Sequence, residues 1–225
     1  MARTFTKIGK EIAIAVKAGG PDTDTNARLR LAIQNAKAAN MPKDRVEAAI
    51  KRVMSKDEKD YEEVVYEGYG PHGIAIVMDC ATDNPTRTVA NIRTYLNRAG
   101  GSLGKTGSLD FLFERKGLFK IAATGIDLEE LELELIDFGA EEIFEEEGDV
   151  YIYTAFSDFG TMQKALEERK IEVLSTELER IPNSTNKLSP EQATEVQRLL
   201  DKLEDDDDIQ SVAHNMDGSS LEDEG

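Results

Sequence analysis

The sequence predicts a multi-domain α+β protein: an N-terminal three-helix domain, followed by two α/β domains, one a ferredoxin-like βαββαβ unit inserted into the other. Three observations predict this fold. In the first 56 residues, apolar side chains recur at the helical spacing of three and four positions. Farther along, a complete strand-helix-strand-strand-helix-strand order follows an incomplete strand-strand-helix-strand piece. A last helix and strand near the end of the chain would complete that piece.

Three short helices are predicted before residue 56. The first carries an apolar stripe from Phe5 to Val16 and ends at Gly19-Gly20. The second begins near Asp24, and Asn40 is a suitable N-cap for the third. The outer faces of all three helices carry lysine or arginine.

Two strands and a helix are predicted next. Residues 61–67 and 73–81 have strand character and are joined by a turn rich in glycine and proline. Asn84 caps a helix that has Pro85 at its first position. Residues 108–113 are predicted to form another strand.

The ferredoxin-like unit is predicted from six consecutive elements. They cover residues 117–122, 128–138, 142–146, 150–155, 158–170 and 171–181. After a linker, Ser189 begins a helix with Pro190 first and Gln192 closing a capping box. A short strand at 209–213 follows, and we expect this helix and strand to complete the earlier piece.

These elements define the predicted domains. They are a basic helical domain at 1–58, a discontinuous α/β domain at 59–115 plus 184–216, a ferredoxin-like acidic domain at 116–183 and a disordered acidic tail at 217–225.

Charge divides the chain into two parts. The 225 residues hold 27 Lys plus Arg against 45 Asp plus Glu, a net charge of −18. Residues 1–56 nevertheless hold 12 basic and 5 acidic side chains, a net charge of +7. A basic module attracts polyanions, so the helical domain is predicted to bind nucleic acid. Phe5 is its one aromatic residue, which favours contact with the phosphate backbone over base stacking.

The side chains predicted to neutralise phosphates are the lysines and arginines on these helices. They are Lys7, Lys10, Lys17, Arg28, Arg30, Lys37, Lys43, Arg45, Lys51 and Arg52. The acidic domains are predicted to orient the encounter and to meet protein partners.

Several classes of protein are excluded by composition. One cysteine, Cys80, cannot form an internal disulfide, and two histidines cannot join it in a plausible zinc site. No apolar run reaches the roughly 18 residues of a membrane span, and the N-terminus lacks a signal-peptide core. We therefore expect a cytoplasmic protein without metal, cofactor or catalytic residue.

Three motifs suggest chemistry and are interpreted otherwise. Residues 99–106 resemble a phosphate-binding loop, but they would leave a helix and enter a strand, the reverse of the order that a phosphate cradle requires. His72 is interpreted as a solvated turn residue. Tyr151 and Tyr153 alternate on one strand, as in RNA-binding sheets, yet acidic residues precede them. A protein-contact or half-exposed face is the preferred interpretation.

A set of motifs resembles the YebC/PmpR family. They are Phe5-Thr6-Lys7, Asn26-Ala27-Arg28-Leu29-Arg30, Asn40-Met41-Pro42-Lys43-Asp44, Tyr66-Glu67-Gly68-Tyr69-Gly70-Pro71-His72-Gly73, Thr82-Asp83-Asn84, Arg87-Thr88-Val89 and Gly101-Ser102-Leu103-Gly104. The resemblance implies a helical domain and two α/β domains, one inserted in the other. Bacterial members are described as cytoplasmic DNA-binding transcriptional regulators, mitochondrial relatives as translational activators, and some bacterial members have been linked to the ribosome. Members usually open with a further basic stretch ahead of the Phe5-Thr6-Lys7 motif. Either the start of this sequence was assigned downstream of the true one or this member lacks the stretch, and in both cases the basic surface is expected to be incomplete as written.

The function predicted is therefore a non-enzymatic, DNA-binding transcriptional regulator. The alternative is a ribosome-associated translation factor, because folded ribosomal RNA presents phosphates as duplex DNA does. A phosphate-hydrolysing enzyme using Lys105 and Thr106, and a protein scaffold acting through the acidic sheets, are two further possibilities. The sequence leaves the oligomeric state open.

Overall fold

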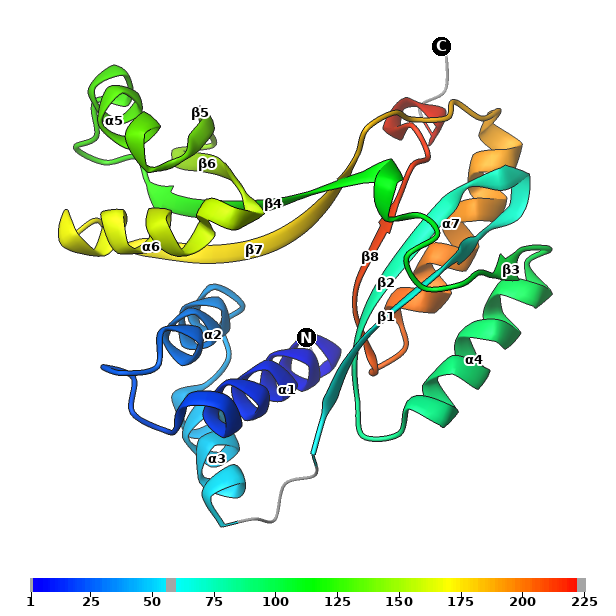
Figure 1. Ribbon diagram of the computed structural model, residues 1–225, viewed down its shortest axis with the longest axis horizontal. Coiled ribbons are helices and arrows are strands. Elements are labelled where there is room, and N and C mark those ends of the chain that lie inside the picture. Colours follow the sequence, from blue (N-terminus) through cyan, green and yellow to red (C-terminus); the bar gives the residue numbers. More distant parts are fainter. Residues whose placement is uncertain (1, 56–59, 222–225) are drawn as a thin grey trace. The chain divides into compact units, whose positions relative to one another are not determined.

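The computed structural model describes residues 2–55 and 60–221, which form two compact units (Figure 1). The first unit contains the described residues of 1–14, 52–114 and 182–225. The second contains residues 15–51 and 115–181. The domain boundaries predicted from the sequence stay a prediction, and the one at 58/59 lies outside the described residues.

The N-terminal helices are α1 (Ala2–Gly19), α2 (Ala27–Ala38) and α3 (Lys43–Met54). Each turns an apolar stripe inward, as the spacing predicts, with Ile12, Leu29 and Val46 among the buried side chains. Asn40 does not cap α3 but lies in the left-handed region, with φ 56°, in the turn after α2. Asparagine tolerates this conformation because its short polar side chain can bond locally.

A four-stranded antiparallel sheet, here called the first sheet, lies in the first unit, with strand order β3-β1-β2-β8. Its strands are β1 (Glu62–Tyr69), β2 (Ala75–Thr82), β3 (Ser102–Leu103) and β8 (Ile209–His214). Because β8 pairs with β2, the end of the chain completes the sheet, as predicted.

Helices α4 (Pro85–Arg98) and α7 (Pro190–Glu204) cover one face of this sheet. Asn84 caps α4, and Ser189 begins α7 with the predicted capping box. The core between helices and sheet consists of fully buried aliphatic side chains from both layers. They include Ile74, Ile76, Met78, Ile92, Leu96, Val196 and Leu203.

The predicted strand at 108–113 is wrong over most of its length. This segment contains a bend at residues 108–109 and the 3-10 helix η2 (Asp110–Leu112). The cause is Glu67, which is 3% exposed. Its carboxylate accepts hydrogen bonds from the backbone N–H groups of Gly107, at 2.7 Å, and Leu109, at 2.6 Å. Backbone donors that would form a strand ladder are bound to a side chain instead.

A second four-stranded antiparallel sheet has strand order β5-β6-β4-β7, the arrangement of a ferredoxin-like unit. Its strands are β4 (Phe113–Ala122), β5 (Ala140–Glu146), β6 (Asp149–Ala155) and β7 (Val173–Pro182). Helices α5 (Leu128–Leu135) and α6 (Phe159–Glu168) share its core with Phe119 and Ile152. The chain enters this unit through β4 and leaves it through β7, so the predicted insertion and fold class are confirmed.

The predicted disordered tail is partly ordered. Residues Gly218–Leu221 form the 3-10 helix η5, and Ser220 in it is buried. The Ser220 hydroxyl accepts a hydrogen bond from the Leu188 N–H group at 3.0 Å. Residues 222–225 lie outside the described residues. Among the helices of residues 2–55 and 60–221, none is long and apolar enough to cross a membrane.

Candidate nucleic-acid interface

Six of the ten cations predicted to bind phosphates have exposed side chains in the second unit, on the last turn of α1 and on α2 and α3. They are Lys17, Arg28, Lys37, Lys43, Arg45 and Lys51. The inward stripe of α2, which includes Leu29 and Ala36, fixes which side of that helix remains in solvent. Arg52 is exposed too but belongs to the first unit.

Asn26 sets the turn that joins α1 to α2. Its side-chain oxygen accepts the Leu29 N–H group at 3.0 Å, which caps α2. Its amide nitrogen donates to the carbonyls of Ala15, at 2.7 Å, and Gly20, at 2.8 Å. Both ends of one buried amide are satisfied, so the exit of α1 and the start of α2 are held together.

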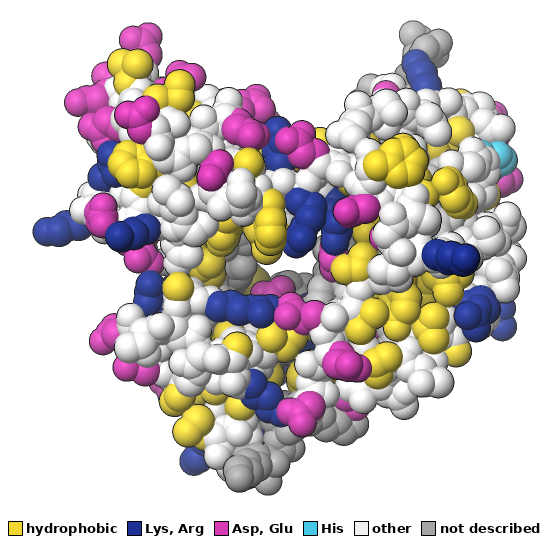
Figure 2. Space-filling view, in the orientation of Figure 1, with side chains coloured by type: hydrophobic (Ala, Val, Ile, Leu, Met, Phe, Trp, Pro, Cys, Tyr) yellow, Lys and Arg dark blue, Asp and Glu magenta, His cyan; other side chains and the backbone are white. Residues whose placement is uncertain are grey.

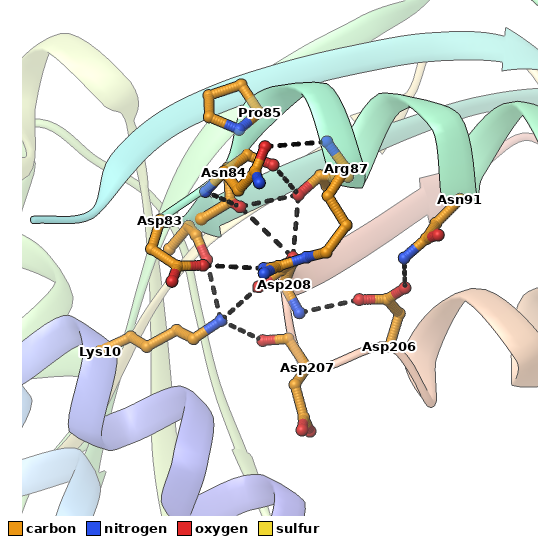
Figure 3. A network of polar contacts seen from close by, with 12 residues as sticks. Lys10, Asp83, Asn84, Pro85, Arg87, Asn91, Asp206, Asp207 and Asp208 are labelled. Atoms are coloured by element: carbon orange, nitrogen blue, oxygen red, sulfur yellow. Dashed lines mark hydrogen bonds and ion pairs between the residues drawn. The ribbon is translucent and has the colours of Figure 1, made fainter. Parts of the chain in front are cut away.

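Lys10 is a correction to the predicted interface. Its ammonium is buried and forms a salt bridge with Asp208 in the first unit, with Nζ 2.8 Å from Oδ1 (Figure 3). It also donates to the carbonyls of Asp207, at 2.7 Å, and Ala81, at 3.0 Å. With all three donors used inside the protein, Lys10 does not reach a phosphate.

Asp208 is the centre of this polar network. Its Oδ2 accepts hydrogen bonds from Arg87, at 2.7 Å, and from Thr88, at 2.8 Å. Burial alone would raise the pKa of Asp208, but the hydrogen bonds from Arg87, Lys10 and Thr88 outweigh it and lower the pKa below its usual value. Arg87 also pairs with Asp83 at 2.8 Å. The cations Lys10 and Arg87 are thus paired with the carboxylates of Asp83 and Asp208. These charges stabilise the fold and are not available to an external ligand.

Two more of the predicted cations have partners within their own units. Lys7 donates to the carbonyl of Glu204 at 3.0 Å, and burial lowers the pKa of its ammonium. Arg30 pairs with Glu167 of α6 at 3.0 Å and donates to the Thr23 carbonyl at 2.5 Å. A phosphate would have to displace these partners, so both residues are weaker candidates than the six exposed cations.

Asn35 joins α2 to the second sheet in a way that the sequence does not signal. Its amide nitrogen donates to the carbonyl of Thr176 at 2.9 Å, and its oxygen accepts the Thr176 N–H group at 2.9 Å. Thr176 lies on β7, an edge strand. One side-chain amide therefore takes the two hydrogen bonds that a neighbouring strand would otherwise make.

The remaining motifs have structural roles. At residues 99–106, α4 ends with Gly100 at φ +82°, the Gly101 N–H group bonds to the Leu96 carbonyl at 2.8 Å, and β3 follows. No helix begins there to bind a phosphate, as the predicted order required. His72 is not simply solvated, because its Nε2 lies 2.7 Å from a carboxylate oxygen of Glu195 on α7.

Comparisons with known proteins agree along the whole chain. The family description "TACO1/YebC protein N-terminal domain" matches residues 1–56, and "TACO1/YebC second and third domain" matches residues 61–216. A protein of Cytophaga hutchinsonii named "Probable transcriptional regulatory protein" is 65% identical, covering 96% of this chain and 91% of its own. A Parabacteroides distasonis protein of the same name is 55% identical, covering 100% and 93%.

A solved structure agrees as well. The crystal structure of a conserved hypothetical protein from Aquifex aeolicus is similar to this chain with a TM-score of 0.80 and 37% sequence identity. The match covers 96% of this chain and 90% of the other.

Proposed function

This chain belongs to the TACO1/YebC family, and from that premise we propose that it is a non-enzymatic regulator of gene expression that binds duplex DNA in the cytoplasm. Its relatives are named probable transcriptional regulatory proteins, which supports a regulatory role. The proposed contact is made by the exposed cations of α1, α2 and α3 in the second unit.

The observation that carries this proposal is that six exposed cations lie on α1, α2 and α3 within one unit of a chain whose net charge is −18. Surface lysines paired with carboxylates are ordinary, and Lys43 has such a partner in Glu47, 3.7 Å away. That pair is exposed, at 90% and 65% for the two side chains, so water screens it and a phosphate can replace Glu47 at little cost. Exposed pairs of this kind leave the cation available to a polyanion.

The proposed contact involves the DNA backbone rather than the bases. Phe5 is the single aromatic residue before Tyr61 and lies in the first unit, so residues 15–51, which carry the six exposed cations, hold no ring on which a base could stack. Phosphate contacts position a protein on the duplex and supply affinity that depends strongly on salt. Sequence preference would then come from groove shape or from a partner protein.

The test is a salt titration of the full chain with a 30-base-pair duplex and with an RNA hairpin of equal charge. The variant Lys37→Gln/Lys51→Gln removes two exposed cations, while Lys105→Gln/Lys164→Gln removes two elsewhere. Each lost phosphate contact lowers the slope of log affinity against log salt by about 0.9 on B-DNA. We expect the slope to fall by about 2 in the first variant and to stay unchanged in the second.

An unchanged slope in the Lys37→Gln/Lys51→Gln protein would overturn the assignment of these helices. Tighter binding of the hairpin than of the duplex, with the same loss in the variant, would keep the interface and replace duplex DNA by folded RNA, the translation-factor alternative.

A further inference from the structure

One face of the second sheet carries aromatic rings surrounded by carboxylates. Side chains alternate along β6: Val150 and Ile152 enter the core with α5 and α6, so Tyr151 and Tyr153 point to the opposite side. Phe144 of β5 stacks on both tyrosines, with ring centroids 5.3 Å from Tyr151 and 6.3 Å from Tyr153. All three rings are half-buried, which leaves part of each ring in contact with water.

Three glutamates lie around Tyr153. Its hydroxyl donates to Glu179 at 3.2 Å, and Glu142 and Glu177 act on it electrostatically. Burial and the charge of Glu179 raise the pKa of Tyr153 to about 12. Burial, followed by the charge of Glu177, raises the pKa of Glu179 itself. Three carboxylates thus lie near one ring, while the Lys116 ammonium on the neighbouring strand β4 pairs with Glu141 at 2.9 Å. We call Phe144, Tyr151, Tyr153, Glu142, Glu177 and Glu179 the aromatic-acidic face.

A lysine of the chain itself shows which ligand this chemistry suits. The Lys120 ammonium lies 5.4 Å from the centre of the Tyr151 ring and 2.7 Å from a carboxylate oxygen of Asp149. A cation is therefore held at one end of the face by a ring and a carboxylate together. At the Tyr153 end the same two components, ring and carboxylate, are present.

We propose that the aromatic-acidic face binds an arginine-bearing basic segment of a partner protein. Guanidinium groups stack on aromatic rings and pair with carboxylates in a planar, bidentate manner, so each arginine would use both components of the face. A nucleic acid would use the rings but would bring phosphates next to Glu142, Glu177 and Glu179, which repel them. The face uses other residues than the proposed DNA contact, because none of its residues belongs to α1, α2 or α3.

The surroundings add to the charge complementarity. Acidic side chains also gather over the part of the second unit that contains α5, on the other side of the sheet, and add to the negative field of the unit (Figure 2). Glu145 and Glu146, at the end of β5, are exposed as well. A basic segment would be attracted over a wide area and fixed by contact with the rings.

The experiment measures binding of two fluorescent 12-residue peptides to the full chain by anisotropy. Each alternates glycine or serine with six arginines or with six lysines, so that charge is equal. We expect the arginine peptide to bind about two- to fivefold more tightly, the difference that stacking on exposed rings supplies. Tyr151→Leu/Tyr153→Leu should abolish this preference, and Tyr151→Phe/Tyr153→Phe, which keeps the rings, should retain it.

Charge variants separate a specific face from general acidity. Glu142→Gln/Glu177→Gln should weaken binding of both peptides, whereas Glu129→Gln/Glu132→Gln on α5 removes equal charge and should have less effect. Equal weakening by both variants, or an arginine preference that survives Tyr151→Leu/Tyr153→Leu, would overturn the proposal. So would direct binding of a fluorescent single-stranded RNA oligomer that is lost in Tyr151→Leu/Tyr153→Leu, because the rings would then bind bases. The salt slope for DNA should be the same in all these variants.

Discussion

Lys10 and Lys17 lie seven residues apart, on nearly the same side of helix α1, but they meet different surroundings. Lys10 is buried and gives its donors to Asp208 and two backbone carbonyls. Lys17 is exposed in the second unit. Identical residue types in one stripe therefore divide into a lysine that stabilises the fold and one that faces solvent. The charge of a segment measures its capacity to bind a polyanion only after its structural cations are subtracted.

The strongest test of this comparison between Lys10 and Lys17 is the effect of each lysine on the stability of the fold. Lys10→Met leaves Asp208 without one of its cations, and it removes a donor from the buried carbonyl of Ala81 and the partly buried carbonyl of Asp207. Removing one partner of a buried pair costs about 3–5 kcal/mol. Lys17→Met, an exposed change, should cost less than about 0.5 kcal/mol. Urea denaturation of both variants is the measurement, and equal midpoints would refute the division.

A smaller effect on stability is expected at the edge of the second sheet, where the neutral side chain of Asn35 is hydrogen-bonded to β7. Asn35→Ala leaves the N–H and C=O groups of Thr176 without their partners. An unsatisfied buried polar group costs about 1–3 kcal/mol. Hydrogen exchange of the Thr176 amide should accelerate in this variant, while the Ile152 amide in the centre of the sheet keeps its protection. Unchanged exchange at Thr176 would show that water replaces the amide without loss.

The smallest expected effect is a dependence on pH in the first unit. Burial lowers the pKa of His214, and its Nδ1 accepts the Met216 N–H group at 3.2 Å, which requires the neutral ring. Because the folded pKa lies below the unfolded value of about 6.5, this stabilisation is complete above that value and is lost as the pH falls toward the folded pKa. Urea midpoints at pH 7.5 and 5.5 should differ more for the parent protein than for His214→Asn.

Asp208 also stabilises the fold more at higher pH, but its contribution changes in a lower pH range than that of His214. Its pKa is lowered by the fold, so its contribution is complete above the unfolded value near 3.9 and is lost below it. A loss of stability already present between pH 7.5 and 5.5 therefore belongs to a group such as His214 and not to Asp208.

Local signals predicted the elements of this fold well. The N-caps Asn84 and Ser189 each bind a backbone N–H group three residues later, so the signal for the helix start is local. In β6 the buried residues alternate with half-buried ones, and this alternation is visible in the residue types. The predicted strand at 108–113 was wrong because Glu67, about forty residues earlier, binds its backbone. Contacts of that kind leave no periodicity in the sequence.

The exposure of the candidate interface residues could be predicted from the sequence only in part, again because distant contacts leave no local signal. Helical spacing places Lys17, Lys37 and Lys51 outward, and the structure leaves them exposed. Nothing near Lys10 shows that its partner is Asp208, 198 residues later. Asn35 and Thr176 are likewise 141 residues apart. Charge and periodicity describe a helix alone, whereas burial depends on what the rest of the chain brings to it.

The hydrogen bonds of the Asn35 amide also limit the ways in which a partner peptide could bind to the second sheet. Asn35 occupies the backbone of Thr176 on the edge strand β7, and charged glutamates line β5 at the other edge, so both edges of the second sheet disfavour pairing with an incoming strand. A basic segment on the aromatic-acidic face would therefore lie across the strands with its own peptide groups hydrated. Recognition would then depend on the spacing of its guanidinium groups and tolerate wide variation in the residues between them.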